Sequence, residues 1–509
     1  MNLVPRIVFV CVAFMLVCTF HLTTSFGKAR LDEKIDGPVL EAMGENTSVP
    51  VLLLGKTQLI DGSAALQTFI TNHTGQSRSA IQTEVISRLK KIAADEQAQI
   101  LQKLGSPPGA RSVWLINAVV VTLSPENIRK AAALEEVKYV YHAQQLPPEP
   151  GDAGKVTTVL APSLRPAFST RGKRINWDLN KIGAAKVWKK LKITGDGVVI
   201  AMLDGGVDYT HQDLRSNIWI NLKEVPNNGV DDDTNGYVDD MYGFDFGRLK
   251  AEVRTPGTAA NHGTWTSGIA AGDGSGGTLT GVAPRARLMP LVFGPSVYTA
   301  VLAHQYALEQ GADVVNMSFS IPDLRNLRGL WRMMADHAMC AGLVLVSGAG
   351  NFQQNQPIPV QQRVPEDIPT VLSIGGVDQK LNLASFSSLG PVEWGSVKWY
   401  GDFSMPPGLT KPDVVAFPGP GYALIHPSGS GYVDPNTNFM GNSFSSPHGS
   451  GVVALMMSAA PELPAWRIQE ILKATARDLE APGKDNRTGH GLIQAFEAVQ
   501  AALKEGRTR

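Results

Sequence analysis

Three residues far apart in the chain carry the side chains that acyl transfer requires. Asp204 ends an apolar run at residues 198–203, and His262 precedes a run of small residues that leads into an apolar helix. Ser443 stands where another helix is expected to start. A carboxylate can orient an imidazole, and the imidazole can then take the proton of a serine hydroxyl that attacks a carbonyl carbon. We therefore consider Asp204, His262 and Ser443 a candidate catalytic set.

Each of the three has an ordinary structural explanation when it is taken alone. An aspartate at the end of a strand often caps the following turn. A serine at the start of a helix is a common N-cap, and a single histidine is more often structural than catalytic. The set therefore depends on a fold that brings the three residues together.

The elements that would position them belong to an α/β fold. From Asn176 onward, short apolar runs alternate with amphipathic helical segments, which predicts a doubly wound parallel sheet. Functional residues of such sheets collect at the carboxyl ends of the strands. The expected strands lie at residues 198–203, 287–292, 314–317, 343–346 and 371–374, and helices are expected at 298–309 and 327–341.

The order Asp, His, Ser along the chain is that of the subtilisin arrangement and differs from the order in α/β-hydrolases. Seven segments are also similar to motifs of the subtilase family of serine peptidases. They are His262-Gly263-Thr264, Gly441-Asn442-Ser443-Phe444-Ser445-Ser446-Pro447-His448, Asp313-Val314-Val315-Asn316-Met317-Ser318, Ala349-Gly350-Asn351, Thr280-Gly281-Val282-Ala283-Pro284, Lys411-Pro412-Asp413-Val414 and Gly489-His490-Gly491-Leu492-Ile493. The chain thus resembles subtilisin-like serine peptidases over about residues 176–503.

This resemblance implies a role for each candidate residue. Ser443 would attack the scissile carbonyl, His262 would transfer the proton to the leaving amine, and Asp204 would stabilise the imidazolium. The side-chain amide of Asn351 and the backbone N–H of Ser443 would stabilise the oxyanion. No cofactor is required for this chemistry.

The resemblance also implies where the substrate binds. Ser318, Phe319 and Ser320 would pair with the substrate backbone, with Gly350 beside them. Four positions differ from the family pattern: Ser320 for glycine, Asn442 for threonine, Trp265 for a second histidine and Gly205 for serine or threonine. Because a side chain at Ser320 narrows the entrance to the pocket, we expect a small or slender P1 residue, the residue whose carbonyl is attacked.

Length and composition are those of a soluble protein with more than one module. The chain has 509 residues, a hydrophobic fraction of 43%, a charged fraction of 18% and a formal net charge of zero. Nothing in this balance favours binding to nucleic acid or to acidic membranes. We expect a monomer.

The N-terminus predicts export. Arg6 precedes an apolar run at residues 7–20, which is short for a membrane span and typical of a signal peptide over residues 1–27. We expect a secreted or periplasmic protein that keeps no membrane anchor after the signal is removed. Cys11 and Cys18 lie in the signal, so Cys340 is the one cysteine left, and we expect it to be buried and inert.

The region after the signal resembles the inhibitory propeptide of the family. Residues 47–143 predict the order strand, helix, strand, helix, strand, and the segments 117–126 and 137–142 resemble the end of such a domain. A proline-rich linker is expected at residues 144–171, followed by a peptidase domain at 172–505. We expect the propeptide to inhibit the enzyme intramolecularly and to be cut off between His142 and Arg171. An unrelated N-terminal α/β module is the alternative.

Residues 227–240 resemble the opening of a calcium-binding loop. Asp231, Asp233, Asn235 and Asp239 offer oxygen ligands at alternate positions, and Gly236 permits a sharp turn. The glutamate expected at the twelfth position is absent, so a solvated turn rich in aspartate and asparagine is the alternative.

Together these features predict a secreted serine endopeptidase that acts on proteins or peptides. The alternative is a catalytically impaired relative that binds peptides as a scaffold.

Overall fold

The computed structural model describes residues 32–143, 155–160, 165, 167–255, 258–294, 296–322 and 324–507. The predicted signal peptide and most of the predicted linker lie outside these residues. Within the described residues, no helix is both long and apolar enough to cross a membrane.

The chain forms two compact units, and each of them consists of two separate segments of the sequence. The first unit comprises residues 1–58 and 89–146, and the second comprises residues 59–88 and 147–509. A segment between two strands of the first unit therefore belongs to the second.

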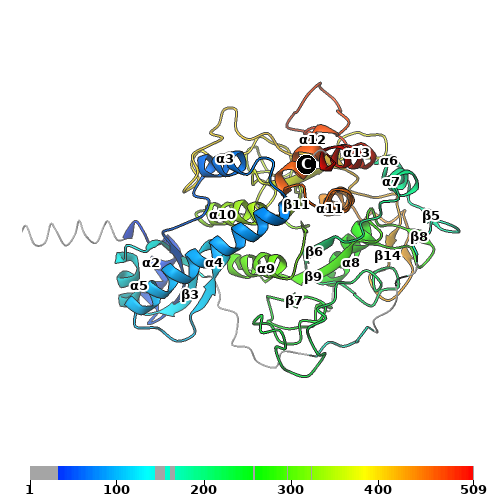
Figure 1. Cartoon of the computed structure of the whole chain (residues 1–509). Helices are drawn as coiled ribbons and strands as arrows, with labels where there is room; N and C mark the ends of the chain where they lie inside the picture. Colours follow the sequence, from blue (N-terminus) through cyan, green and yellow to red (C-terminus); the bar gives the residue numbers. More distant parts are fainter. Residues whose placement is uncertain are drawn as a thin grey trace, which may run out of the picture. The chain divides into compact units, whose positions relative to one another are not determined.

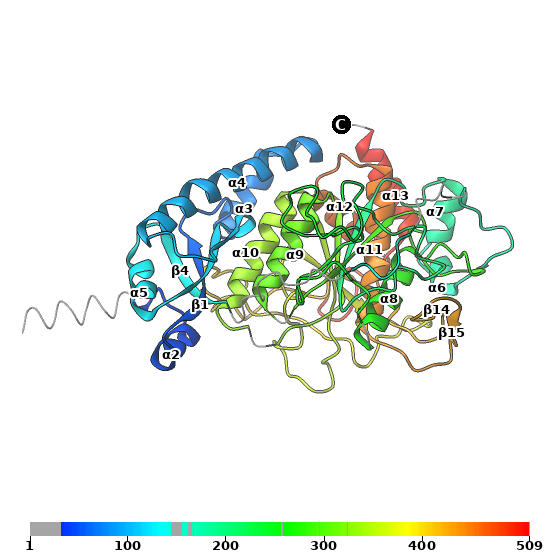
Figure 2. The same cartoon turned by 90° about the horizontal axis from the view of Figure 1, so that it is seen from below.

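The first unit contains an antiparallel sheet with helices packed on it. The strand order is β2 (Arg111–Val113), β3 (Ala118–Leu123), β1 (Val49–Gly55) and β4 (Val137–His142). Helices α2 (Gly37–Glu45) and α5 (Pro125–Ala133) contact these strands (Figure 2). Helix α5 begins after Ser124, whose hydroxyl caps the helix by accepting the N–H of Asn127 at 3.3 Å.

The second unit is built on a seven-stranded parallel sheet, as the alternation of apolar runs predicts. Its strand order is β13 (Val414–Ala416), β12 (Val371–Gly376), β11 (Val344–Gly348), β10 (Val314–Met317), β6 (Val199–Asp204), β9 (Arg287–Val292) and β7 (Phe244–Asp245). Strands β10 to β13 are buried at every residue, as expected for strands covered on both faces.

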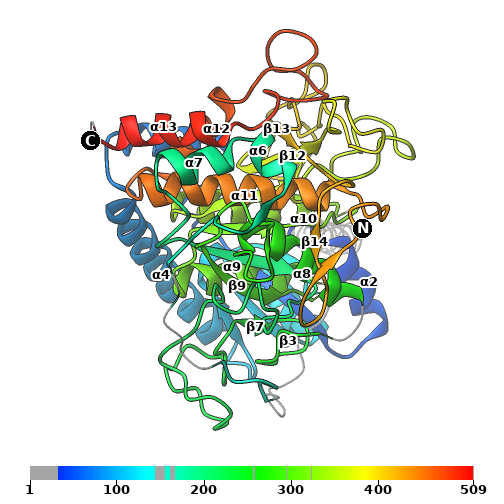
Figure 3. The same cartoon turned by 90° about the vertical axis from the view of Figure 1, so that its right-hand side faces the viewer.

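Helices cover both faces of this sheet (Figure 1). Helices α8 (Thr258–Ala271) and α11 (Asn442–Ala459) pack together on one face, while α9 (Val297–Glu309) and α10 (Leu327–Cys340) pack together on the other. Figure 3 shows α13 (Ala495–Gly506) beside α11. After β6, the chain adds β9 on one side of this strand and then β10 on its other side. The carboxyl ends of β6 and β10 therefore form a topological switch point, where functional sites are expected.

The remaining elements of the two units complete the secondary structure of the described residues. Cys340, at the end of α10, is buried as expected. The other elements are α3 (Ser63–Asn72), α4 (Arg78–Lys103), η1 (Trp114–Ile116), β5 (Arg174–Ile175), α6 (Trp177–Lys181), α7 (Ala184–Lys190), β8 (Thr278–Leu279), β14 (Leu424–Ile425), β15 (Tyr432–Val433) and α12 (Ala465–Ala474).

Residues 59–88 are held in the second unit by polar contacts with little exposure. Arg78 forms an ion pair with Asp313 at 2.7 Å, and their side chains are 12% and 14% exposed. The N–H of Ile60 donates to the ring of His337 at 3.1 Å, and this bond is buried. These contacts lie beside β10, so the segment is a structural part of the second unit.

We predict that Arg78→Ala lowers the thermal unfolding midpoint by about 5 °C, because it leaves the partly buried Asp313 without its cation, at a cost of about 2–3 kcal/mol. The measurement is calorimetry of the full chain carrying Ser443→Ala. Lys91→Ala is the control, since its pair with Asp95 is 76% and 63% exposed and contributes about 0.5 kcal/mol or less. Equal shifts for the two variants would contradict the prediction.

Candidate active site

Asp204 ends β6, and its carboxylate is held by three donors. The N–H of Gly205 donates to Oδ1 at 2.7 Å, and the hydroxyl of Thr266 donates to Oδ2 at 3.2 Å. His262 Nδ1 lies 2.8 Å from Oδ1 and 3.0 Å from Oδ2. The carboxylate is 6% exposed, so its charge acts on the histidine with little screening by water.

His262 lies in α8, and its backbone is fixed by a close approach to β6. A Cβ atom on the next residue, Gly263, would lie 2.1 Å from the carbonyl oxygen of Gly206, so only glycine fits there. Burial acts to lower the pKa of His262, but the charge and hydrogen bond of Asp204 outweigh it and raise the pKa above the usual 6.5. The ring is 31% exposed, which leaves it an accessible edge.

Ser443 lies in the first turn of α11 and exchanges hydrogen bonds with the end of β10. Its hydroxyl donates to the carbonyl oxygen of Ser318 at 3.1 Å, and the hydroxyl of Ser318 donates to the carbonyl oxygen of Ser443 at 2.9 Å. The ring of the next residue, Phe444, stacks on His262 with centroids 6.3 Å apart. The serine and the histidine therefore lie on neighbouring parts of one site.

Asn351 follows β11 and is oriented by α11. Its Oδ1 atom accepts the N–H of Asn442 at 2.8 Å, which fixes the amide because an N–H cannot accept. The Nδ2 atom is on the side of Gly441, 3.3 Å from the place of a Cβ there. The amide thus offers an N–H next to the helix start that carries Ser443, where the helix dipole also favours negative charge.

The predicted substrate-binding residues line a cavity of about 120 Å³ beside Ser443, here named the Ser443 cavity. The structure thereby brings together the predicted substrate-binding residues, the predicted nucleophile and Asn351. The lining residues are Ser318, Phe319, Ser320, Gly348, Gly350, Asn351, Phe352 and Ser443.

Comparison with known proteins places the chain in a family. The model of the subtilase family matches residues 195–491, which is more than half of the chain. The chain belongs to the subtilase family.

Three curated relatives illustrate how far the similarity extends. Fervidolysin of Fervidobacterium pennivorans is 26% identical over 76% of this chain and 53% of its own length. A calcium-dependent protease of Trichormus variabilis is 27% identical over 65% of this chain and 50% of its own. Subtilisin DY of Bacillus licheniformis is 28% identical over 60% of this chain and 92% of its own. This subtilase therefore spans about half the length of the first two relatives.

Three contributors to the site in this subtilase are not evident from the sequence. Thr266 donates to Asp204, and the buried side chain of Asn316 ties β10 to α11. The carboxylate of Glu366, in the turn before β12, accepts a hydrogen bond from Ser320 at 2.6 Å. Two signals in the sequence point to two of them: Thr266 lies one helical turn from His262, and Asn316 lies within the family-like motif at residues 313–318.

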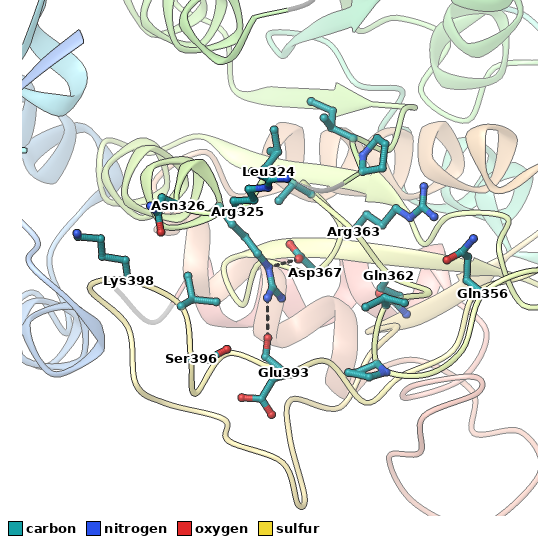
Figure 4. Close-up of a pocket in the computed structure, with 17 residues that line it drawn as sticks. Leu324, Arg325, Asn326, Gln356, Gln362, Arg363, Asp367, Glu393, Ser396 and Lys398 are labelled. Carbon is teal, nitrogen blue, oxygen red and sulfur yellow. Dashed lines mark hydrogen bonds and ion pairs between the residues drawn. The ribbon is translucent and has the colours of Figure 1, made fainter. Parts of the chain in front are cut away.

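The second unit has another cavity, of about 600 Å³ (Figure 4). It is lined in part by Ile321, which pairs with Val364 in an antiparallel bridge. Arg328 donates to the carboxylate of Asp367 and to the carbonyl oxygen of Glu393, at 2.7 Å each. Of the cations that line this cavity, Arg328 is therefore paired with a carboxylate.

The acidic loop at residues 227–240 forms a cluster that differs from the predicted set. Glu224, Asp231 and Asp233 bring carboxylate oxygens within 4.8 Å of one another. Burial raises the pKa of Glu224 to about 7, with Asp240 and Asp233 adding to the shift. Asp239, a member of the predicted set, is not in this cluster, and its carboxylate accepts the N–H groups of Asn228 and Gly229 at 3.0 Å.

We predict that Asp204→Asn lowers the pKa of His262 below 6.5, because the charge that raises it is removed while the burial that lowers it remains. The measurement is NMR titration of ¹³C-labelled histidine in the Ser443→Ala background. Asp378→Asn, an exposed aspartate after β12, is the control and should leave the titration of His262 unchanged. An unaltered pKa in Asp204→Asn would disprove the coupling.

Proposed function

We propose that this subtilase is a secreted serine endopeptidase that cleaves proteins or peptides and is matured by removal of a signal and a propeptide. The observation that carries the proposal is the arrangement around the Ser443 cavity. There the serine, the amide of Asn351 and the substrate-binding residues meet, and His262 is held nearby by Asp204.

In this mechanism His262 acts as the general base. Since Nδ1 faces Asp204, Nε2 is the atom that accepts the proton of Ser443. The hydroxyl turns from the carbonyl of Ser318 toward the imidazole when substrate binds, as catalytic hydrogen bonds often tighten only in the complex. Ser443 then attacks the carbonyl carbon, and His262 returns the proton to the leaving amine. Water hydrolyses the acyl-enzyme by the same route.

The carbonyl oxygen of the substrate gains negative charge in this step. The Nδ2–H of Asn351 and the backbone N–H of Ser443 stabilise it, and removing one such donor typically costs about 10²- to 10³-fold in kcat. His262 must be neutral to accept the proton. Because its pKa is raised, the active form predominates only above pH 6.5, and activity falls as the pH drops through that pKa.

The first unit is proposed to be the inhibitory propeptide, with a self-cleavage site between His142 and Arg171. The predicted propeptide, residues 47–143, contains the four strands of the antiparallel sheet and α5, whereas α2 precedes this range and residues 59–88 within it group with the second unit. Export through the signal at residues 1–27 and a monomeric mature enzyme complete the proposal.

A calcium ion is proposed at the cluster of Glu224, Asp231 and Asp233, where the oxygen ligands suit a hard cation. The relative named a calcium-dependent protease supports this assignment. The ion would offset the repulsion among three carboxylates and stabilise the loop; catalysis does not involve it.

We predict that calcium raises the thermal midpoint of the Ser443→Ala protein relative to chelator, because an ion bound only to the folded state stabilises it by about 2.7 kcal/mol at 100 times Kd. Adding Asp233→Asn should reduce the shift, whereas adding Asp434→Asn, in another exposed loop, should preserve it. A midpoint that calcium leaves unchanged argues against the site.

We predict that Ser443→Ala lowers casein hydrolysis by about 10⁶-fold, because the nucleophile is lost, and abolishes labelling by a fluorophosphonate probe. The variant should also remain uncut between His142 and Arg171. Ser428→Ala, at an exposed position, is the control and should be cut, labelled and active. If matured wild-type protein is neither labelled nor active, the chain is a peptide-binding scaffold instead.

A further inference from the structure

A buried carboxylate lies directly behind the Ser443 cavity. The side chain of Glu366 is in a residue with 0% exposure, yet its Oε1 atom accepts the hydroxyl of Ser320, a cavity-lining residue, at 2.6 Å. The same oxygen lies 2.9 Å from the place of a Cβ on Gly350, which also lines the cavity. Because Gly350 has no side chain, nothing of that residue but hydrogen stands between the cavity and the carboxylate.

Among the described residues, Glu366 has no cationic partner. The guanidinium of Arg363 stacks on Phe352 at 3.8 Å, and only its backbone N–H reaches Oε1, at 3.1 Å. The nearby Arg328 is paired with Asp367 at 2.7 Å. The second oxygen, Oε2, is buried and has no hydrogen-bond partner within the described part of the chain.

Burying the carboxyl group of Glu366 costs free energy unless another group pairs with its unsatisfied oxygen. A buried carboxyl group with one unsatisfied oxygen costs free energy whether it is charged or protonated. Burial, the main cause, raises its pKa to about 8, with the neighbouring Asp367 adding to the shift, so without a cation the group is mainly protonated near neutral pH. A positively charged group from the cavity would supply both a donor and a compensating charge.

We propose that Glu366 selects lysine or arginine at P1 by pairing with its cationic end behind the part of the Ser443 cavity that Ser320 and Gly350 line. The inference rests on the proposed peptidase function and names its substrate class. It narrows the expectation of a small or slender P1 residue, which rested on Ser320 alone, to a slender residue with a positive charge. The hydroxyl of Ser320, a cavity-lining residue, is hydrogen-bonded to Glu366 and therefore lies between the cavity and the carboxylate. A lysine side chain is unbranched and thin, and it suits a cavity of about 120 Å³.

The test compares peptides that differ only at P1, with Lys, Arg, Met, Leu, Phe or Ala. Rates are expressed per active site, counted with a fluorophosphonate probe. In wild-type enzyme, kcat/KM for Lys and Arg should exceed that for Met and Leu by at least about 10-fold, since charge-assisted hydrogen bonds discriminate to that extent. Glu366→Gln should lower the Lys and Arg values by about 10- to 100-fold and the Met and Leu values by much less. Glu480→Gln, which removes a surface carboxylate paired with Arg487, should leave the P1 profile unchanged.

The outcomes separate the two proposals. If wild-type enzyme is labelled and cleaves best after Phe, Leu or Ala, the role of Glu366 is wrong while the peptidase function stands. The same conclusion follows if Glu366→Gln lowers all substrates equally. If the wild-type protein is neither labelled nor active, the peptidase function itself fails. Should Glu366→Gln not fold, the wild-type profile alone decides.

Discussion

The contact between the carboxylate of Asp204 and Nδ1 of His262 sets the requirements for the rest of the second unit. A charge that is only 6% exposed has to be supported by donors, and the end of a parallel strand supplies them through Gly205 and Thr266. The histidine must then reach that strand end from a helix. Helix α8 can approach closely enough because Gly263 has no side chain to collide with Gly206. The geometry of the pair is thus determined by the sheet core.

Asn316 supports the segment around Ser443 through hydrogen bonds, as Gly205 and Thr266 support Asp204. It is fully buried in β10, and its Oδ1 accepts the hydroxyls of Ser446 and Ser450 of α11 at 2.8 and 2.9 Å. Its Nδ2 donates to Ser318 at 3.0 Å, which is in turn bonded to Ser443. The end of β10, the start of α11 and the predicted substrate-binding segment are therefore connected by one polar network, whose members satisfy one another in the interior.

Much of the fold and of the candidate site could be predicted from the sequence, and the exceptions have physical reasons. Apolar runs predict β6, β9, β10, β11 and β12 correctly, because strands buried on both faces need continuous hydrophobic sequence. The candidate site residues were predicted from motifs that occur in a fixed order along the chain and that also mark turns and helix starts. By contrast, Glu366 lies in a turn whose partners, Ser320 and Gly350, are distant in sequence, so no local pattern signals it. Glu224 was missed for the same reason, since the loop motif begins after it.

The grouping of residues 59–88 with the second unit bears on how the chain would change once it is cut. These residues precede the proposed cleavage region, yet Arg78 and Ile60 bond to Asp313 and His337 of the second unit. Before cleavage their attachment is intramolecular and insensitive to dilution. After cleavage the same contacts become those of a two-chain complex, whose persistence depends on concentration and on its dissociation rate. Cleavage of one peptide bond would therefore make dissociation of the N-terminal region possible but would not by itself release it.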